Sequence, residues 1–419
     1  MLKTFNFEKL PIVEIVNEII IDATKNRASD IHIDPFNDVL KIRIRIDGTL
    51  IDYATVPNDY KKNLVTRIKI IAGMNITENR LPQDGAIKTS LNGIPLDMRV
   101  SSLPTNNGEK IVIRILDYSM SIQGLEQLGF TKDNFEKIMK MINLPNGIIL
   151  VTGATGTGKS TTVYSILQRL NREEANVITV EDPVEMDIPG VNQVQVNSEI
   201  GLTFANVLRS ILRQDPDIIM IGEIRDDETA TIAVRASVTG HLVLSTIHTN
   251  NSLNTIERLL DMEVERYLLA ASLSGIISQK LARKLCPHCR KKITPTPYEK
   301  YLFKKNLGID LNEIYVAGDG CDNCMNGYRG RIAIHEVLLI DEDIRDAISN
   351  NVRKEDLRKL VYSENVHTLL QDGLIKVAQG LTSFEEIIKL IELDVEDIVI
   401  PKGENAENNN VQTSNVEQK

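Results

Sequence analysis

The sequence predicts an α/β protein of more than one domain, in which a small α+β domain precedes a doubly wound, parallel-rich sheet. Its 419 residues, 42% of them hydrophobic, exceed what one ordinary domain needs. Runs that alternate apolar and polar residues fill much of the first 117 positions. Nearly continuous apolar runs separated by helical patterns follow, as expected of parallel strands covered on both faces.

The first domain is expected over residues 1–117. Apolar residues recur at helical spacing from Pro11 to about Arg27 and predict an amphipathic helix. The runs KIRIRID and GTLIDYATV alternate around Asp47-Gly48, which is a hairpin signal. A helix from about Asp59 to Gly73 and two further alternating runs, AIKTSLNGIPLDMRVSS and EKIVIRILD, complete this domain.

The rest of the chain is predicted to form a domain of alternating strands and helices, followed by an insertion, a helical region and a tail. The runs GIILVTG, NVITV, DIIMIG and HLVLSTIH predict its buried strands. The last residues are polar and cannot repay the entropy of ordering, so they predict disorder. We expect a linker at 118–127, the parallel-sheet domain at 128–280, a cysteine-bearing insertion at 281–332, a helical region at 333–400 and a disordered tail at 401–419.

Composition limits the classes of function. The formal net charge of −10 gives no overall basic character of the kind that nucleic-acid binding uses. No uninterrupted apolar run is long enough to span a bilayer, and the start MLKTFNFEKL lacks the features of a signal peptide. We therefore expect a cytoplasmic protein that does not bind nucleic acid.

A glycine-rich segment, GATGTGKS at 153–160, fits the pattern G-x-x-x-x-G-K-[ST] between an apolar run and a helical one. Its glycines let backbone N–H groups converge on phosphate oxygens, and the following helix N-terminus favours negative charge. Lys159 would add a point charge at the terminal phosphates, and Ser160 should bind Mg²⁺. The predicted nucleotide-binding residues are Gly153, Ala154, Thr155, Gly156, Thr157, Gly158, Lys159, Ser160 and Thr161.

Acidic residues follow two further apolar strands. The strand DIIMIG leads to Glu223, with Gly222 in the place where P-loop proteins usually carry an aspartate. Glu223 is thus expected in the water shell of Mg²⁺, the alternative being that it only pairs with an arginine. The strand ITV leads to Glu181, Asp182 and Glu185, which are candidates to orient or deprotonate an attacking water. Taken alone, such an acidic loop can also be merely solvated.

All four cysteines fall into two C-x-x-C pairs, which in a reducing compartment favours metal ligation over disulfides. Cys286 and Cys289 form one pair, and Cys321 and Cys324 form the other after about 31 residues, a spacing longer than usual for ribbon-like sites. Four thiolates suit tetrahedral Zn²⁺ with no open position, so the zinc would be structural. His288 is expected to be a neighbour of the site rather than a ligand.

With these residues in place, the chain resembles the type II secretion and type IV pilus assembly ATPases from about Val13 to Ile400. Four family motifs occur in order: the P-loop GATGTGKST, the acidic box ITVEDPVE, the metal-binding strand LRQDPDIIMIGEIRDDETA and the histidine box TGHLVLSTIHTN. The resemblance implies a RecA-like P-loop NTPase domain behind a small PAS-like domain. It also implies an ATP hydrolase that works as a mechanical motor.

The resemblance assigns roles to individual residues. Glu185 would be the catalytic base, supported by Glu181 and Asp182, with Glu223 beside Mg²⁺. His241 and His248 would couple the site to its surroundings, although each read by itself is more typical of hydrogen-bonded scaffold. Family members carry nucleotide-sensing arginines at the positions of Arg99 and Arg114, and Arg209, Arg213, Arg225 and Arg258 also match family arginines.

The resemblance further implies a homo-hexamer that drives assembly of a type IV pilus, a competence pilus or a type II secretion pseudopilus through an inner-membrane platform protein. The tetracysteine pattern favours assembly and secretion motors over pilus-retraction motors, which lack it. The chain looks like a short form without the extra N-terminal domain of longer members, so its docking at the inner face of the membrane is left open. A retraction motor, a nucleic-acid-translocating ring ATPase and a slow nucleotide-dependent binding module are the alternatives.

Overall fold

The computed structural model describes residues 3–91, 94–116, 124–363 and 366–391. The chain divides into two compact units, the first made of 1–128, 159–224 and 240–246, and the second of 129–158, 225–239 and 247–419. The predicted tail and residues 118–123 of the predicted linker lie outside the described part of the chain. Within that part, no helix combines the length and the apolar character needed to cross a membrane.

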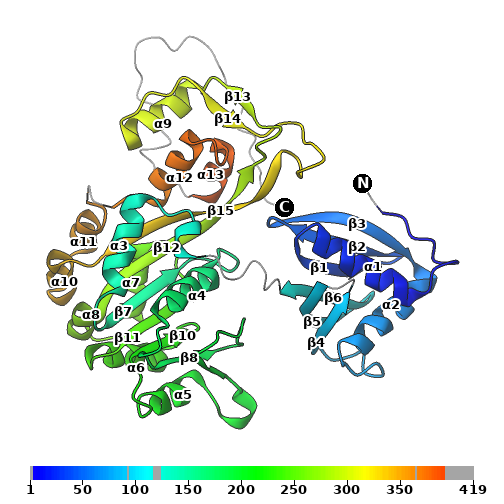
Figure 1. Cartoon of the computed structure of the whole chain (residues 1–419), viewed down its shortest axis with the longest axis horizontal. Helices are drawn as coiled ribbons and strands as arrows, with labels where there is room; N and C mark the ends of the chain where they lie inside the picture. The colour runs from blue at the N-terminus through cyan, green and yellow to red at the C-terminus, as the bar shows by residue number, and fades with distance from the viewer. Residues whose placement is uncertain (1–2, 92–93, 117–123, 364–365, 392–419) are drawn as a thin grey trace. The chain divides into compact units, whose positions relative to one another are not determined.

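An antiparallel sheet with the strand order β3-β2-β1-β6-β5-β4 forms the start of the first unit (Figure 1). Its elements are α1 (Ile12–Lys25), β1 (Ala28–Pro35), β2 (Val39–Ile46), β3 (Thr49–Pro57), α2 (Asn58–Ile71), β4 (Gln83–Leu91), β5 (Ile94–Thr105) and β6 (Gly108–Leu116). The hairpin forms as predicted, with Asp47 and Gly48 both at positive φ, 49° and 86°. The apolar faces of α1 and α2 share one core with the strands. The PAS-like assignment stays a prediction.

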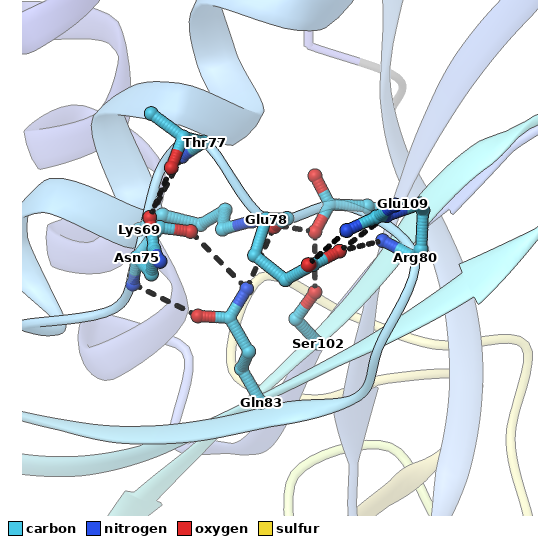
Figure 2. A network of polar contacts seen from close by, with 8 residues as sticks. All are labelled: Lys69, Asn75, Thr77, Glu78, Arg80, Gln83, Ser102 and Glu109. Carbon is cyan, nitrogen blue, oxygen red and sulfur yellow. Dashed lines mark hydrogen bonds and ion pairs between the residues drawn. The ribbon is translucent and has the colours of Figure 1, made fainter.

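A polar network fixes the loop between α2 and β4 (Figure 2). The wholly buried Lys69 donates from Nζ to the Glu78 carbonyl (2.6 Å) and to Glu109 Oε1 (2.7 Å). The Gln83 amide then bonds the Asn75 backbone at both N and O. A buried ammonium is tolerated only with such partners, so this network ties the loop to the sheet.

The first unit also contains four parallel strands in the order β11-β10-β8-β9. Its remaining elements are η2 (Leu125–Gln127), α4 (Lys159–Leu170), β8 (Val177–Glu181), β9 (Asn192–Gln195), η3 (Ser198–Ile200), α5 (Phe204–Ile211), β10 (Ile218–Ile221) and β11 (Leu242–Ile247). Every residue of β8, β10 and β11 is buried, which confirms the strands predicted from continuous apolar runs. Their carboxyl ends share one edge because Ile221 pairs with both Val180 and Ser245.

In the second unit β12 pairs in parallel with β7 and antiparallel with β15. The elements are α3 (Lys132–Ile142), β7 (Gly147–Thr152), α6 (Asp227–Val238), α7 (Ser252–Asp261), α8 (Arg266–Ser272), β12 (Leu273–Leu285), β13 (Lys291–Ile293), α9 (Pro297–Leu307), β14 (Ile314–Val316), β15 (Tyr328–Leu339), α10 (Glu342–Ser349), α11 (Lys354–Val361), α12 (Leu369–Ala378) and α13 (Phe384–Leu390). Residues 333–339 thus form a strand where a helical region was expected. The reason is pairing with the long β12, a distant partner in sequence.

The insertion does not stand alone. Helix α9 begins with a capping box in which Thr296 and Glu299 exchange hydrogen bonds, and it ends at the left-handed Gly308. Its buried Leu302 and Phe303 belong to one core with residues of β12, β15, α12 and α13. The cysteine-bearing insertion is therefore anchored on the C-terminal helices.

Candidate functional site

The glycine-rich loop joins β7 to α4 and belongs, up to Gly158, to the second unit. Gly156 and Gly158 have φ of 80° and 88°, a conformation that favours glycine. The Thr157 hydroxyl donates to the Ala154 carbonyl (2.9 Å), and the Gln279 side chain donates to the Thr157 carbonyl (2.7 Å). The loop is thus shaped by protein hydrogen bonds while residues 154–156 stay exposed.

Helix α4 begins at Lys159, which is 9% exposed. Burial lowers the pKa of the Lys159 ammonium, and the carboxylate of Glu223 acts against that shift. Within the first unit, the structure therefore brings the predicted phosphate-binding lysine close to the predicted metal-site carboxylate. Ser160 is exposed and Thr161 is half-buried in the first turn of the helix.

Gly222 lies where a larger residue would not fit easily. A Cβ atom there would approach the Glu181 Cα to 3.3 Å and the Val180 carbonyl to 3.4 Å. Its own carbonyl accepts a hydrogen bond from Thr246 (2.7 Å). Close packing between β10 and β8 thus accounts for the glycine at the usual aspartate position, and the half-buried Glu223 follows it directly.

The predicted acidic residues differ sharply in environment. Glu181 is 3% exposed and accepts hydrogen bonds from Thr179 (2.7 Å), Gln193 (3.0 Å) and the Tyr164 hydroxyl. The side chain of Glu185 is 42% exposed. Glu181 is therefore held in the interior, whereas Glu185 is accessible to solvent, as is the exposed Asp182.

Tyr164 on α4 links these residues and was not predicted. Its hydroxyl donates to Glu181 and accepts from the Glu185 backbone N–H (3.2 Å). Burial, and then the Glu181 carboxylate, raise the pKa of Tyr164, so it stays a neutral donor. One tyrosine in an apolar helix gives no sequence signal beyond core packing.

The two predicted sensor arginines lie directly opposite each other on β5 and β6. Arg99 Nη2 lies 3.2 Å from Glu185 Oε2 and donates to the Val184 carbonyl (3.0 Å). Arg114 is exposed and pairs with Asp30 (2.9 Å). Of the two, the structure brings Arg99 to an acidic residue of the site and places Arg114 in an ion pair within the N-terminal sheet.

The two histidines lie at opposite ends of β11. His241 precedes its first residue and His248 follows its last, so six residues, or about 20 Å of strand, separate them. The carboxyl end of β11 shares an edge with the ends of β8 and β10. His248, which is exposed, is therefore at that edge, and the half-buried His241 is not.

The other family-matching arginines are exposed: Arg209, Arg213, Arg225 and Arg258. Arg213 bonds the Arg209 carbonyl (2.7 Å), one turn earlier. These contacts assign them no function.

The four cysteine sulfurs all lie within 4.8 Å of one another. Cys286 Sγ is 3.8 Å from Cys321 Sγ, and Cys289 Sγ is 3.6 Å from Cys324 Sγ. Zn–S bonds of about 2.3 Å in a tetrahedron place sulfurs about 3.8 Å apart, so these residues fit a zinc ion. His288 is exposed and outside the cluster.

Comparisons with known proteins identify the family. Residues 6–389 match the family described as Type II/IV secretion system protein. The Type II secretion system protein E of Dickeya dadantii is 45% identical over 381 residues, which are 91% of this chain and 76% of that protein. The Type IV pilus assembly ATPase PilB of Thermus thermophilus is 45% identical over 380 residues, which are 90% of this chain and 42% of that protein.

Solved structures of two proteins are also similar to this chain. The pilus retraction motor PilT with bound ADP is 27% identical with a TM-score of 0.61, covering 93% of this chain and 99% of that one. The ATPase DotB of Legionella pneumophila has a TM-score of 0.68 at 22% identity, covering 92% and 97%, which shows a shared fold. The chain therefore belongs to the type II/IV secretion system protein family, and its relatives include proteins named as type II secretion and type IV pilus assembly ATPases.

Proposed function

We propose that this ATPase hydrolyses ATP at the loop 153–158 and uses the energy to drive assembly of a type IV pilus, a competence pilus or a type II secretion pseudopilus. The observation that supports the site most strongly is the buried Lys159 beside Glu223 at the start of α4. Burial makes the ammonium costly to keep charged, so an incoming polyanion gains a partner that water no longer screens. Loop backbone N–H groups and the start of α4 would hold the remaining phosphate charge.

Mg²⁺ would be bound by the Ser160 hydroxyl, with Glu223 in its water shell, and would neutralise charge on the terminal phosphates. Glu185, whose side chain is 42% exposed, would take the proton of the attacking water, because a general base must come within hydrogen-bond reach of the water that it deprotonates. The buried Glu181 and the exposed Asp182 would support the segment rather than perform this proton transfer.

Arg99 would sense the nucleotide, since its guanidinium already reaches Glu185. Arg114 and the two histidines would act less directly, His248 at the carboxyl edge of the strands and His241 at the other end of β11. The cysteine cluster would hold structural Zn²⁺, because four sulfur ligands leave no open position for chemistry.

The motor would act as a homo-hexamer at the cytoplasmic face of the inner membrane, bound to a polytopic platform protein. Assembly is favoured over retraction for two reasons. The identity to secretion and pilus-assembly relatives is 45%, against 27% to the retraction motor PilT. The tetracysteine cluster is the second reason. The formal net charge of −10 gives no support to nucleic acid as a substrate.

The test is steady-state release of phosphate from Mg-ATP by the purified full chain, with and without a candidate platform protein from the same organism. We expect turnover that the platform protein stimulates and that duplex DNA does not. Turnover stimulated by DNA, with binding that weakens steeply as salt rises, would favour a translocase instead. A preparation without nucleotide binding would reject the proposed site.

A further inference from the structure

A glutamine outside every predicted motif lies against the loop 153–158, which is called the phosphate loop below. Gln279 is in the middle of β12, is 2% exposed and donates from Nε2 to the Thr157 carbonyl at 2.7 Å. Thr157 and Gln279 are 122 positions apart in sequence but belong to the same unit. A buried amide that donates to a loop carbonyl constrains the orientation of that peptide.

The orientation matters because the C=O and N–H groups of a trans peptide point in opposite directions. With the Thr157 carbonyl directed at Gln279, the N–H of Gly158 points away from β12. Gly158 has φ of 88° and, as a glycine, can adopt the alternative peptide orientation at little steric cost. That alternative would turn a carbonyl oxygen, rather than an N–H, toward a phosphate.

The packing leaves little freedom on the β12 side of the loop. A Cβ atom at Gly153 would come within 2.5 Å of the Gln279 carbonyl oxygen, and one at Gly158 within 3.2 Å of Gln279 Nε2. The loop backbone therefore contacts Gln279 closely. Gly153 and Gly158 make this contact possible because they have no side chain. No water fits between the amide and the carbonyl at 2.7 Å.

We propose that Gln279 is a positioning residue of the nucleotide site: its amide holds the Thr157–Gly158 peptide with the Gly158 N–H directed at the phosphates of ATP. This inference rests on the proposed function of the loop 153–158. Gln279 acts on the nucleotide only through the loop backbone.

Two nearly isosteric substitutions test the role of the amide donor. Gln279→Met keeps the length and removes the donor, and Gln279→Glu places a carboxylate oxygen against the carbonyl and favours the flipped peptide. Because the Gly158 N–H would bind ground state and transition state alike, the loss should appear in KM rather than in kcat. We expect KM for ATP to rise about tenfold in Gln279→Met and about 100-fold in Gln279→Glu, with kcat changed by less than about twofold.

The measurement is ATP hydrolysis over a range of Mg-ATP concentrations, with equilibrium binding of a fluorescent ATP analogue to the full chain. Gln371→Glu is the matched control. Its amide donates to the Asn306 carbonyl (3.1 Å) on α9, away from the loop, so ATP affinity should not change. If Gln279→Glu does not fold, as judged by circular dichroism and melting, Gln279→Met decides the question.

A KM within about twofold of wild type in Gln279→Met, or a loss confined to kcat, would overturn the inference, because a general loss of structure lowers the active fraction and not the apparent affinity. Lys159→Ala separates this result from failure of the proposed function. If wild type binds ATP and Lys159→Ala does not, the site stands whatever Gln279 shows. If wild type binds no ATP, the proposed function fails first.

Discussion

The phosphate loop and the cysteine module, defined as residues 286–327, are both indicated by short motifs but are built in different ways. The loop is shaped by hydrogen bonds among protein atoms, from Thr157 to Ala154 and from Gln279 to Thr157. The cysteine module instead draws its four sulfurs within 4.8 Å of one another.

Backbone segments of the module also lie in close contact, so that two of its glycines could not carry a side chain. A Cβ atom at Gly318 would come within 1.9 Å of the Cys289 carbonyl oxygen, and one at Gly327 within 2.6 Å of the Gly318 carbonyl. Four sulfurs so close together need a cation to offset their charge once they ionise. We therefore expect the loop to keep its shape without a ligand, whereas the module should lose its shape without a metal ion.

The largest effect is expected from Lys159→Ala. Removing the buried ammonium at the start of α4 would take away the charge proposed to bind the terminal phosphates, so ATP turnover should fall by more than about 10³-fold. The melting temperature without nucleotide should stay close to that of wild type, because the loop does not depend on the ligand. Hydrolysis assays and thermal melting check this, and wild-type turnover in the variant would reject the assignment of the site.

Glu185→Gln should separate binding from chemistry. The side chain is accessible and would act on water, so its loss should slow hydrolysis by about 10²-fold and leave ATP bound. Rapid filtration of bound nucleotide is the measurement. Glu181→Gln is the contrasting variant: since Glu181 is buried among three donors, the change should lower stability more than it changes bound ATP.

Metal removal should affect the module and leave the loop intact. Metal analysis should find about one Zn²⁺ per chain, and chelation should increase hydrogen exchange in residues 286–327. ATP affinity should change by less than about twofold, as judged by binding of a fluorescent ATP analogue. Finding no metal in freshly purified, reduced protein would contradict the zinc assignment. A loss of ATP binding on chelation would show that the loop also depends on the metal.

The smallest effect concerns the ion pair between Arg283 on β12, just before the module, and Glu386 on α13. The pKa of Glu386 is lowered: burial acts against this, but the hydrogen bonds and positive charge of Arg283, together with the charge of Lys389, outweigh it. A lowered folded-state pKa gives stability that is present above the ordinary value of 4.5 and is lost as pH falls below it. Glu386→Gln should remove about 1 kcal/mol of stability at neutral pH and flatten the acid limb of a melting-temperature profile. An unchanged acid limb would show that the pair contributes nothing.

Much of the fold could be predicted because its signals are local. The hairpin at Asp47-Gly48, the buried strands β8, β10 and β11 and the glycine-rich turn each depend on neighbouring residues or on burial on both faces. The strand at 333–339 was missed, since it forms by pairing with β12, which lies many positions earlier.

The residues proposed to bind phosphate, magnesium and zinc could be predicted from motif spacing alone, because short backbone segments present those side chains. Only the folded chain separates the interior Glu181 from the accessible Glu185 and puts His241 and His248 at opposite ends of a strand. It also brings Tyr164 to Glu181, and Gln279 to the loop 153–158. Burial and hydrogen-bond partners arise from contacts between segments far apart in sequence, and no local pattern encodes those contacts.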